Sequence, residues 1–128
     1  MHWFHYPSLA GILLAVALPR LPLQYAPLVI AIVLHLLCDY ALQTEWLCTK
    51  AANRNALVLH SALAGFIPLA GMGLAAGNPG FALVGGLCGF YTHLVIDHCN
   101  KFGLPLVPGL VLDQTLHLAV IVHLFMSF

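Results

Sequence analysis

The stretch APLVIAIVLHLLCDYALQ, residues 26–43, combines a long apolar run with one His and one Asp. An α-helix needs about 20 apolar residues to cross the hydrocarbon core of a bilayer. Three further runs of this kind follow it, at residues 56–76, 81–100 and 108–128. The sequence therefore predicts a single all-α domain over residues 1–128, a polytopic membrane helix bundle with four long transmembrane helices.

A fifth apolar stretch near the N-terminus predicts a short additional helix. Its apolar core, Leu9 to Leu18, is too short to cross a bilayer alone. Aromatic residues at positions 3, 4 and 6 can extend it as an interfacial belt. Residues 3–18 are therefore a short N-terminal apolar helix that spans only if this belt is included.

The composition excludes a soluble globular protein. Hydrophobic residues make up 62% of the chain and charged residues 6%, whereas a soluble domain has roughly 25% charged residues. Four basic and four acidic side chains give a net charge of zero, so no nucleic-acid partner is predicted. The expected partner is the lipid bilayer.

Basic residues in the connecting loops indicate the orientation. Lys50 and Arg54 lie between the first two long runs, and Lys101 lies between the last two. Because Lys and Arg are enriched in cytoplasmic loops, loops 44–55 and 101–107 are predicted to be cytoplasmic.

Small residues in the third run favour close helix packing. Gly85 and Gly89 are spaced by four residues, a pattern that lets helix backbones approach each other in membranes. The pair predicts a tight contact with a neighbouring helix, and a homo-oligomer through this face is an open alternative. His98 and His123 are expected to be hydrogen-bonded residues of the bundle.

Every Asp of the chain lies within or at the end of a predicted helix, four residues from a His. The pairs are His35 with Asp39, His93 with Asp97, and Asp113 with His117. Four residues is about one helical turn, so both members of a pair lie on one helix face. With up-and-down connectivity, the three pairs and His60 fall at about the same depth near one interface.

These residues predict a metal site. An ionised Asp near the bilayer centre costs about 2.5 to 3.5 kcal/mol, and Arg54 and Lys101 near the water are too few to pair three of them. Imidazole and carboxylate are ordinary ligands for zinc, iron or manganese, and about one to two ions are expected. The predicted ligands are His35, Asp39, His60, His93, Asp97, Asp113 and His117. Gln43, Gln114 and Lys101 are expected to support these ligands from behind.

The sequence resembles a family of small bacterial membrane proteins catalogued as a domain of unknown function. The resemblance rests on the string from His35 through Asp39, Gln43 and Trp46, followed by His60, the pair His93 and Asp97, and Asp113-Gln114-x2-His117. More distantly, the order of these residues is similar to inner-membrane metal-dependent hydrolases and the zinc-dependent phospholipase C group. The resemblance implies a bacterial inner-membrane protein that hydrolyses phosphoesters at a zinc cluster.

The function expected from these residues is metal-dependent hydrolysis of a phosphoester or lipid-linked substrate near the cytoplasmic headgroup level. Asp113 or Asp39 is the expected general base, and Lys101 or Lys50 is expected to neutralise a phosphate. The alternative is a proton or divalent-metal transporter or channel that uses the same His and Asp residues. A haem-binding bundle and a scaffold without an ion are weaker alternatives.

Overall fold

A computed structural model describes residues 22–99 and 103–127, and within them every regular element is helical. The short helix expected at residues 3–18 and the side chain of Lys101 lie outside the described residues. The elements, in chain order, are a 3-10 turn Leu23–Tyr25, α2 (Ala26–Leu36), the π-helical turn η4 (Leu37–Ala41), the 3-10 helix η5 (Leu47–Ala51), α3 (Arg54–Ser61), the π-helical turn η6 (Ala62–Phe66), α4 (Ile67–Ala75), α5 (Pro79–His98) and α6 (Leu106–Phe125).

Four continuous helical segments of the described chain are long and apolar enough to cross a membrane. They are Leu23–Ala41, Arg54–Ala75, Pro79–His98 and Leu106–Phe125. Each begins two or three residues before the apolar run that predicted it. At two of them a polar cap sets the start, since Asn53 accepts hydrogen bonds from two N–H groups of α3 and Asn78 accepts one from Phe81 of α5.

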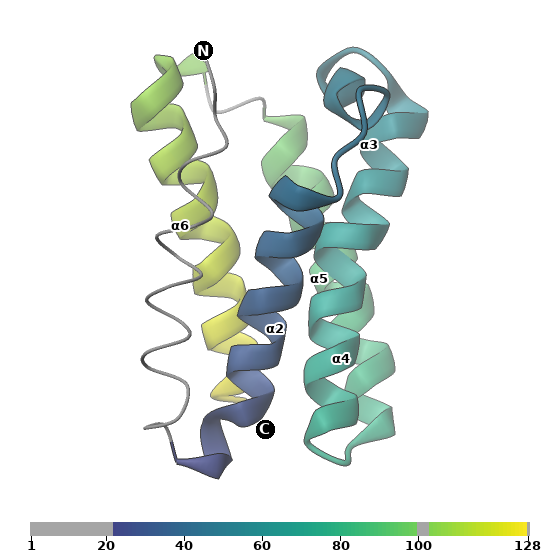
Figure 1. Cartoon of the computed structure of the whole chain (residues 1–128), viewed down its shortest axis with the longest axis vertical. Helices are drawn as coiled ribbons and strands as arrows, with labels where there is room; N and C mark the ends of the chain where they lie inside the picture. Colours follow the sequence, from purple (N-terminus) through teal and green to yellow (C-terminus); the bar gives the residue numbers. More distant parts are fainter. Residues whose placement is uncertain (1–21, 100–102, 128) are drawn as a thin grey trace.

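The connections place the two basic loops at one end of the bundle. The segment containing η5 joins α2 to α3 at the same end at which α5 finishes and α6 begins, as Figure 1 shows. The α4 to α5 turn lies at the opposite end, where Gly77 has a φ of 70°, a conformation that favours glycine. Both loops predicted to be cytoplasmic therefore lie on the same side.

The apolar core occupies the half of the bundle that contains α4. α4 packs against both α2 and α5, and the buried core residues Ala31, Leu69, Met72 and Ile121 meet there. The buried His and Asp side chains lie at the end of α2, on η4, on α3, in the last turns of α5 and in the middle of α6.

Two glycines bring η6 and α5 into backbone contact beside His93. A Cβ atom on Gly65 would lie 2.5 Å from the carbonyl oxygen of Gly89 and 2.7 Å from Cβ of His93. The close packing predicted for Gly89 is thus present, with Gly65 as its partner. Gly85 instead faces the ring of Phe81 in its own helix. Gly85 and Gly89 are both buried within the chain.

We expect Gly89→Ala to destabilise the bundle by about 1 to 3 kcal/mol, the usual cost of overpacking a core. The added methyl group would collide with the Gly65 backbone. Gly80→Ala, in the same helix, is the control, since its Cβ would meet only Asn78 Oδ1 at 3.6 Å. Thermal unfolding in detergent measures both, and equal unfolding temperatures would contradict the backbone contact.

Candidate metal centre

Each of the four candidate spans contributes at least one side chain to a single buried group, which we call the His/Asp cluster. The exposed fraction of each of these side chains is below 10%. The members are His35 from α2, Asp39 from η4, His60 from α3, His93 and Asp97 from α5, and Asp113 and His117 from α6. The structure therefore brings together all seven residues that the sequence predicts as ligands.

The two π-helical turns lie next to the cluster. η4 contains Asp39, and η6 begins two residues after His60. Such turns occur mostly as single interruptions of α-helices, often at functional sites. The Ala64 carbonyl of η6 lies 3.1 Å from Nδ1 of His35 and is its hydrogen-bond acceptor. The other ring nitrogen of His35, Nε2, lies 3.4 Å from Gln114 Oε1.

His60 lies at the centre of one half of the cluster. Its Nε2 atom is 3.0 Å from Asp39 Oδ1, 3.2 Å from Asp97 Oδ2 and 3.1 Å from His93 Nε2. His60 itself is fully buried. Side chains from three different spans thus direct their polar atoms at one point.

Asp97 connects this half to the other. Its Oδ2 faces His60, whereas its Oδ1 is 3.3 Å from His117 Nε2. The rings of His93 and His117 are stacked with centroids 3.9 Å apart, and Asp113 Oδ1 lies 3.7 Å from His117 Nε2. The two carboxylate oxygens of Asp97 therefore face different imidazoles.

Within residues 22–99 and 103–127, two sets of three ligand atoms are compact enough to hold an ion. Within each set the atoms lie within 4.8 Å of one another. The sets are Asp39, His60 and His93, and His93, Asp97 and His117. His93 belongs to both, and each of its ring nitrogens has a single lone pair for one ion. The two sets therefore share one residue and compete for it wherever they use the same nitrogen.

Lys50 enters the cluster from η5. Its Nζ atom is 2.6 Å from Asp97 Oδ2, 2.7 Å from His60 Nε2 and 3.7 Å from Asp39 Oδ1. From the sequence, Lys50 is expected to be a loop cation that binds a substrate phosphate. Only Arg54 and Lys101, not Lys50, are predicted from the sequence as possible ion-pair partners of the Asp side chains. That interpretation is incomplete, because a long Lys stem lets a loop residue place its ammonium among buried groups.

The two glutamines hold Asp39 in position. Gln114 Nε2 donates to Asp39 Oδ2 at 2.6 Å and to Asp113 Oδ2 at 3.1 Å. Gln43 Nε2 donates to the main-chain oxygen of Asp39 at 2.5 Å and lies 3.4 Å from its Oδ1. Both glutamine side chains therefore hydrogen-bond to a predicted ligand.

Gln114→Leu should weaken metal binding by about 10-fold, the low end of the usual cost of losing a hydrogen bond around a metal site. The low end is expected because Gln114 bonds to Asp39 and Asp113 and not to the set His93, Asp97 and His117. The change removes donors from two carboxylates of the cluster. Thr115→Val is the matched control, because Thr115 is exposed and its hydroxyl bonds only to Val111 of its own helix. Competition with a metal-sensitive dye measures the affinity, and equal affinities in the two variants would contradict this role.

The remaining described histidines lie away from the bundle interior. His98 and His123 are exposed, so the expectation that they are hydrogen-bonded bundle residues is wrong. Each lies near the end of its helix, where a side chain readily reaches water. His98 instead lines a pocket beside Asp97.

Comparison with known proteins supports one of the two resemblances. A family model described as "Protein of unknown function (DUF3307)" matches residues 28–128. No curated protein matches the chain, and no solved structure matches it. The resemblance to a family of unknown function is therefore confirmed, and the comparisons add nothing in favour of a hydrolase or phospholipase C relationship.

Proposed function

The chain belongs to the DUF3307 family, and we propose that it is a membrane-embedded metal-dependent hydrolase of a phosphoester or lipid-linked substrate. The His/Asp cluster is the proposed catalytic site. Its metal is a divalent ion, zinc in the first instance, with iron or manganese as alternatives of the same ligand preference.

The charge balance of the cluster carries this proposal. Among the described residues, the cluster contains three buried carboxylates, from Asp39, Asp97 and Asp113, and one ammonium group, that of Lys50, which pairs with Asp39 and Asp97. When the imidazoles are neutral, three negative charges and one positive charge leave two negative charges. Unpaired buried charge is strongly unfavourable. A single divalent cation neutralises this remainder and suits the imidazole and carboxylate atoms that surround it.

The contacts of Lys50 indicate which residues hold the ion. Lys50 Nζ lies within 4 Å of two members of the first ligand set, Asp39 and His60, and of one member of the second set, Asp97. The ammonium therefore takes the place of an ion mainly in the first set. His93, Asp97 and His117 form the other set. They would hold the ion, with His35 and Asp113 at its border, and Lys50 would remain beside it as a fixed positive charge.

A bound divalent ion would supply the Lewis acidity that activates water and polarises a phosphoryl or acyl oxygen. Asp113 is the proposed general base that would accept the proton of the attacking water. It contacts fewer cationic or hydrogen-bonding groups than Asp39. Asp113 meets His117 and Gln114, whereas Asp39 meets His60, Lys50 and both glutamines. A carboxylate with fewer partners is the better general base.

The depth of the cluster favours a substrate at the lipid headgroups. The 20 residues of α5 extend about 30 Å, the thickness of the hydrocarbon core. Asp97 lies in its last turn and Asp113 in the second turn of α6. In a bacterial inner membrane with loops 44–55 and 101–107 cytoplasmic, the site would face the cytoplasmic headgroups.

Elemental analysis of protein purified in mild detergent tests the proposal. We expect about one divalent ion per chain, together with hydrolysis of phosphodiesters or phospholipids in mixed micelles that a chelator abolishes and the metal restores. A protein that is folded and free of metal after gentle extraction would contradict the proposed site.

The second candidate is a proton or divalent-metal transporter. Buried ionisable side chains on every candidate span favour it, because such residues also form ion pathways in membranes. Beyond the cluster, however, Ala31, Leu69, Met72 and Ile121 fill the described core, and the Gly65 and Gly89 backbones meet. Ion flux in proteoliposomes without any hydrolysed product would favour the transporter over the hydrolase.

A further inference from the structure

A small pocket opens directly beside the His/Asp cluster. It lies between η5, the start of α3 and the end of α5, and its volume is about 110 Å³. This is room for roughly three or four water molecules at their share of liquid volume, and so for a group of phosphate size. Its polar lining comes from Lys50, Asn53, Arg54, Asp97 and His98.

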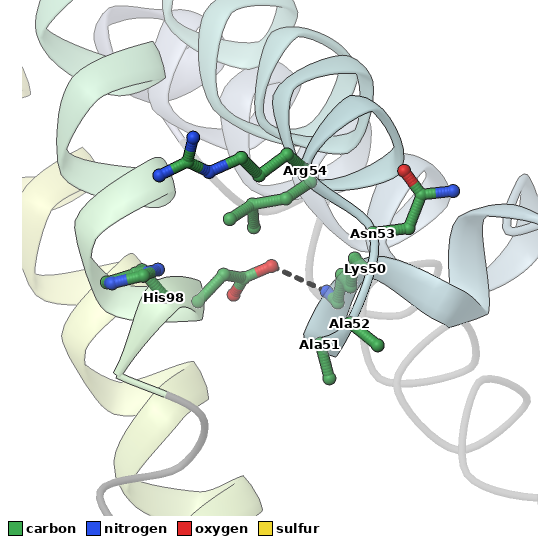
Figure 2. Close-up of a pocket in the computed structure, with 8 residues that line it drawn as sticks. Lys50, Ala51, Ala52, Asn53, Arg54 and His98 are labelled. Carbon is green, nitrogen blue, oxygen red and sulfur yellow. Dashed lines mark ion pairs between the residues drawn. The ribbon is translucent and has the colours of Figure 1, made fainter.

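The two basic side chains of this pocket, Lys50 and Arg54, differ in their ion pairs. Lys50 is held by Asp97 and Asp39. Arg54 is exposed, and none of the four carboxylate side chains of the chain, all within the described residues, forms an ion pair with it. Figure 2 shows the Arg54 side chain extending across the pocket toward the helix that carries His98, with Lys50 on the other side. The pocket therefore contains an unpaired guanidinium group.

We propose that this pocket binds a phosphate group of the substrate, with Arg54 as its anchor. This inference rests on the proposed function, since it assigns the substrate class of the same site. The guanidinium group of an Arg binds phosphate through two parallel N–H donors. Lys50 has no such pair of donors, and its ammonium is already engaged by Asp97 and Asp39. Because Asp97 lines the pocket, a phosphate bound to Arg54 would lie next to a proposed metal ligand.

The required chemistry is a phosphate monoester or diester, which a lipid headgroup or a soluble phosphate compound can provide. The level of the pocket, at the ends of α5 and α3, coincides with the headgroup region if these helices span a bilayer. Leu57 supplies an apolar wall that suits the start of a lipid chain. The experiment therefore includes both sources.

Binding is measured on the full chain after chelation, so that no ligand can attach to a metal. Thermal unfolding in uncharged detergent is followed with inorganic phosphate, with short-chain phosphatidic acid, and with diacylglycerol of the same chain length as the phosphate-free probe. A ligand that binds only the folded state raises the unfolding temperature with its concentration. We expect a rise with phosphatidic acid and none with diacylglycerol.

Arg54→Gln should weaken this binding by about tenfold or more, as expected for the loss of charge-assisted hydrogen bonds. Arg54→Lys, which keeps the charge but not the paired donors, should give an intermediate affinity and serves if Arg54→Gln does not fold. Thr49→Glu is the charge-matched control: it also lowers the net charge by one, and Thr49 is an exposed residue outside the pocket. This variant should bind like the unaltered protein.

The outcomes separate this inference from the proposed function. A rise with inorganic phosphate alone would support the pocket with a soluble ligand, and a rise with phosphatidic acid alone would support it with a headgroup. Equal binding by Arg54→Gln and the unaltered protein would overturn the pocket, even if the metal and hydrolysis are present. Binding that depends on Arg54 in a protein that never contains metal would retain the pocket and overturn the hydrolase.

Discussion

Replacing Asp97 with Asn should remove the metal ion and the metal-dependent hydrolysis together. Asp97 faces His60 with one oxygen and His117 with the other, and it belongs to the ligand set of which Lys50 contacts only one member. Loss of a partner that merely supports a ligand costs about 10- to 100-fold in affinity, so loss of the ligand itself should exceed about 100-fold. Elemental analysis and the micelle assay provide the two measurements.

Glu45→Gln is the matched control for this variant. Glu45 is the one carboxylate side chain of the sequence outside the cluster, and it is exposed. Its replacement makes the same chemical change, from carboxylate to amide, without touching a proposed ligand. Unaltered metal content in Asp97→Asn would contradict the assigned ligand set, whereas equal loss in both variants would attribute the effect to total charge.

The helices could be predicted from the sequence because hydrophobic length is a local property. A run of about 20 apolar residues identifies a candidate span wherever it occurs, and the structure places a helix over each of the four long runs. The ends were less predictable. Asn53 and Asn78 begin their helices outside the apolar runs, so the cap and not the hydropathy sets the boundary.

The convergence of the cluster was predictable for a related reason. Residues four apart lie on one helix face, and alternating helices return residues near opposite ends of successive runs to the same depth. These two rules suffice to predict that His35, His60 and His93 approach one another. The structure gives ring centroids 5.0 Å apart for His60 and His93, and 5.5 Å apart for His35 and His93.

The position of Lys50 and the contact of Gly65 with Gly89 could not be predicted from hydrophobic length or helical periodicity. The path of η5 depends on how a short loop folds over the bundle, which no periodic pattern encodes. The glycine contact depends on the crossing of two helices, and Gly65 lies in a π-helical turn that shifts the residues facing a neighbour. Both features are tertiary, and both determine the surroundings of His60 and His93.

Lys50→Met should raise the metal content from about one ion per chain to two. The Lys50 ammonium lies 2.7 Å from His60 Nε2 and 3.7 Å from Asp39 Oδ1, so it takes the place of a cation among these ligand atoms. Met keeps much of the stem but not the charge. Without the ammonium, the cluster has three negative charges, and a second divalent ion becomes favourable beside Asp39 and His60.

The same variant should make stability depend on metal. In chelator we expect Lys50→Met to lose about 3 to 5 kcal/mol of unfolding free energy, the usual cost of removing one partner of a buried ion pair. Saturating zinc should restore most of this loss, because an ion bound only by the folded state stabilises it. Lys50→Arg, which retains a positive charge at the end of a long stem, should remain close to the unaltered protein in both respects.

These expectations distinguish a metal centre from a buried network that only carries protons. In a proton-carrying network, the negative charges left by Lys50→Met would be neutralised by protons, and stability would follow pH without responding to zinc. In a metal centre, zinc and the Lys50 ammonium compete for the same oxygen and nitrogen atoms, so removing one favours the other. A Lys50→Met protein with unchanged metal content and no stabilisation by zinc would therefore contradict both the charge balance and the hydrolase built on it.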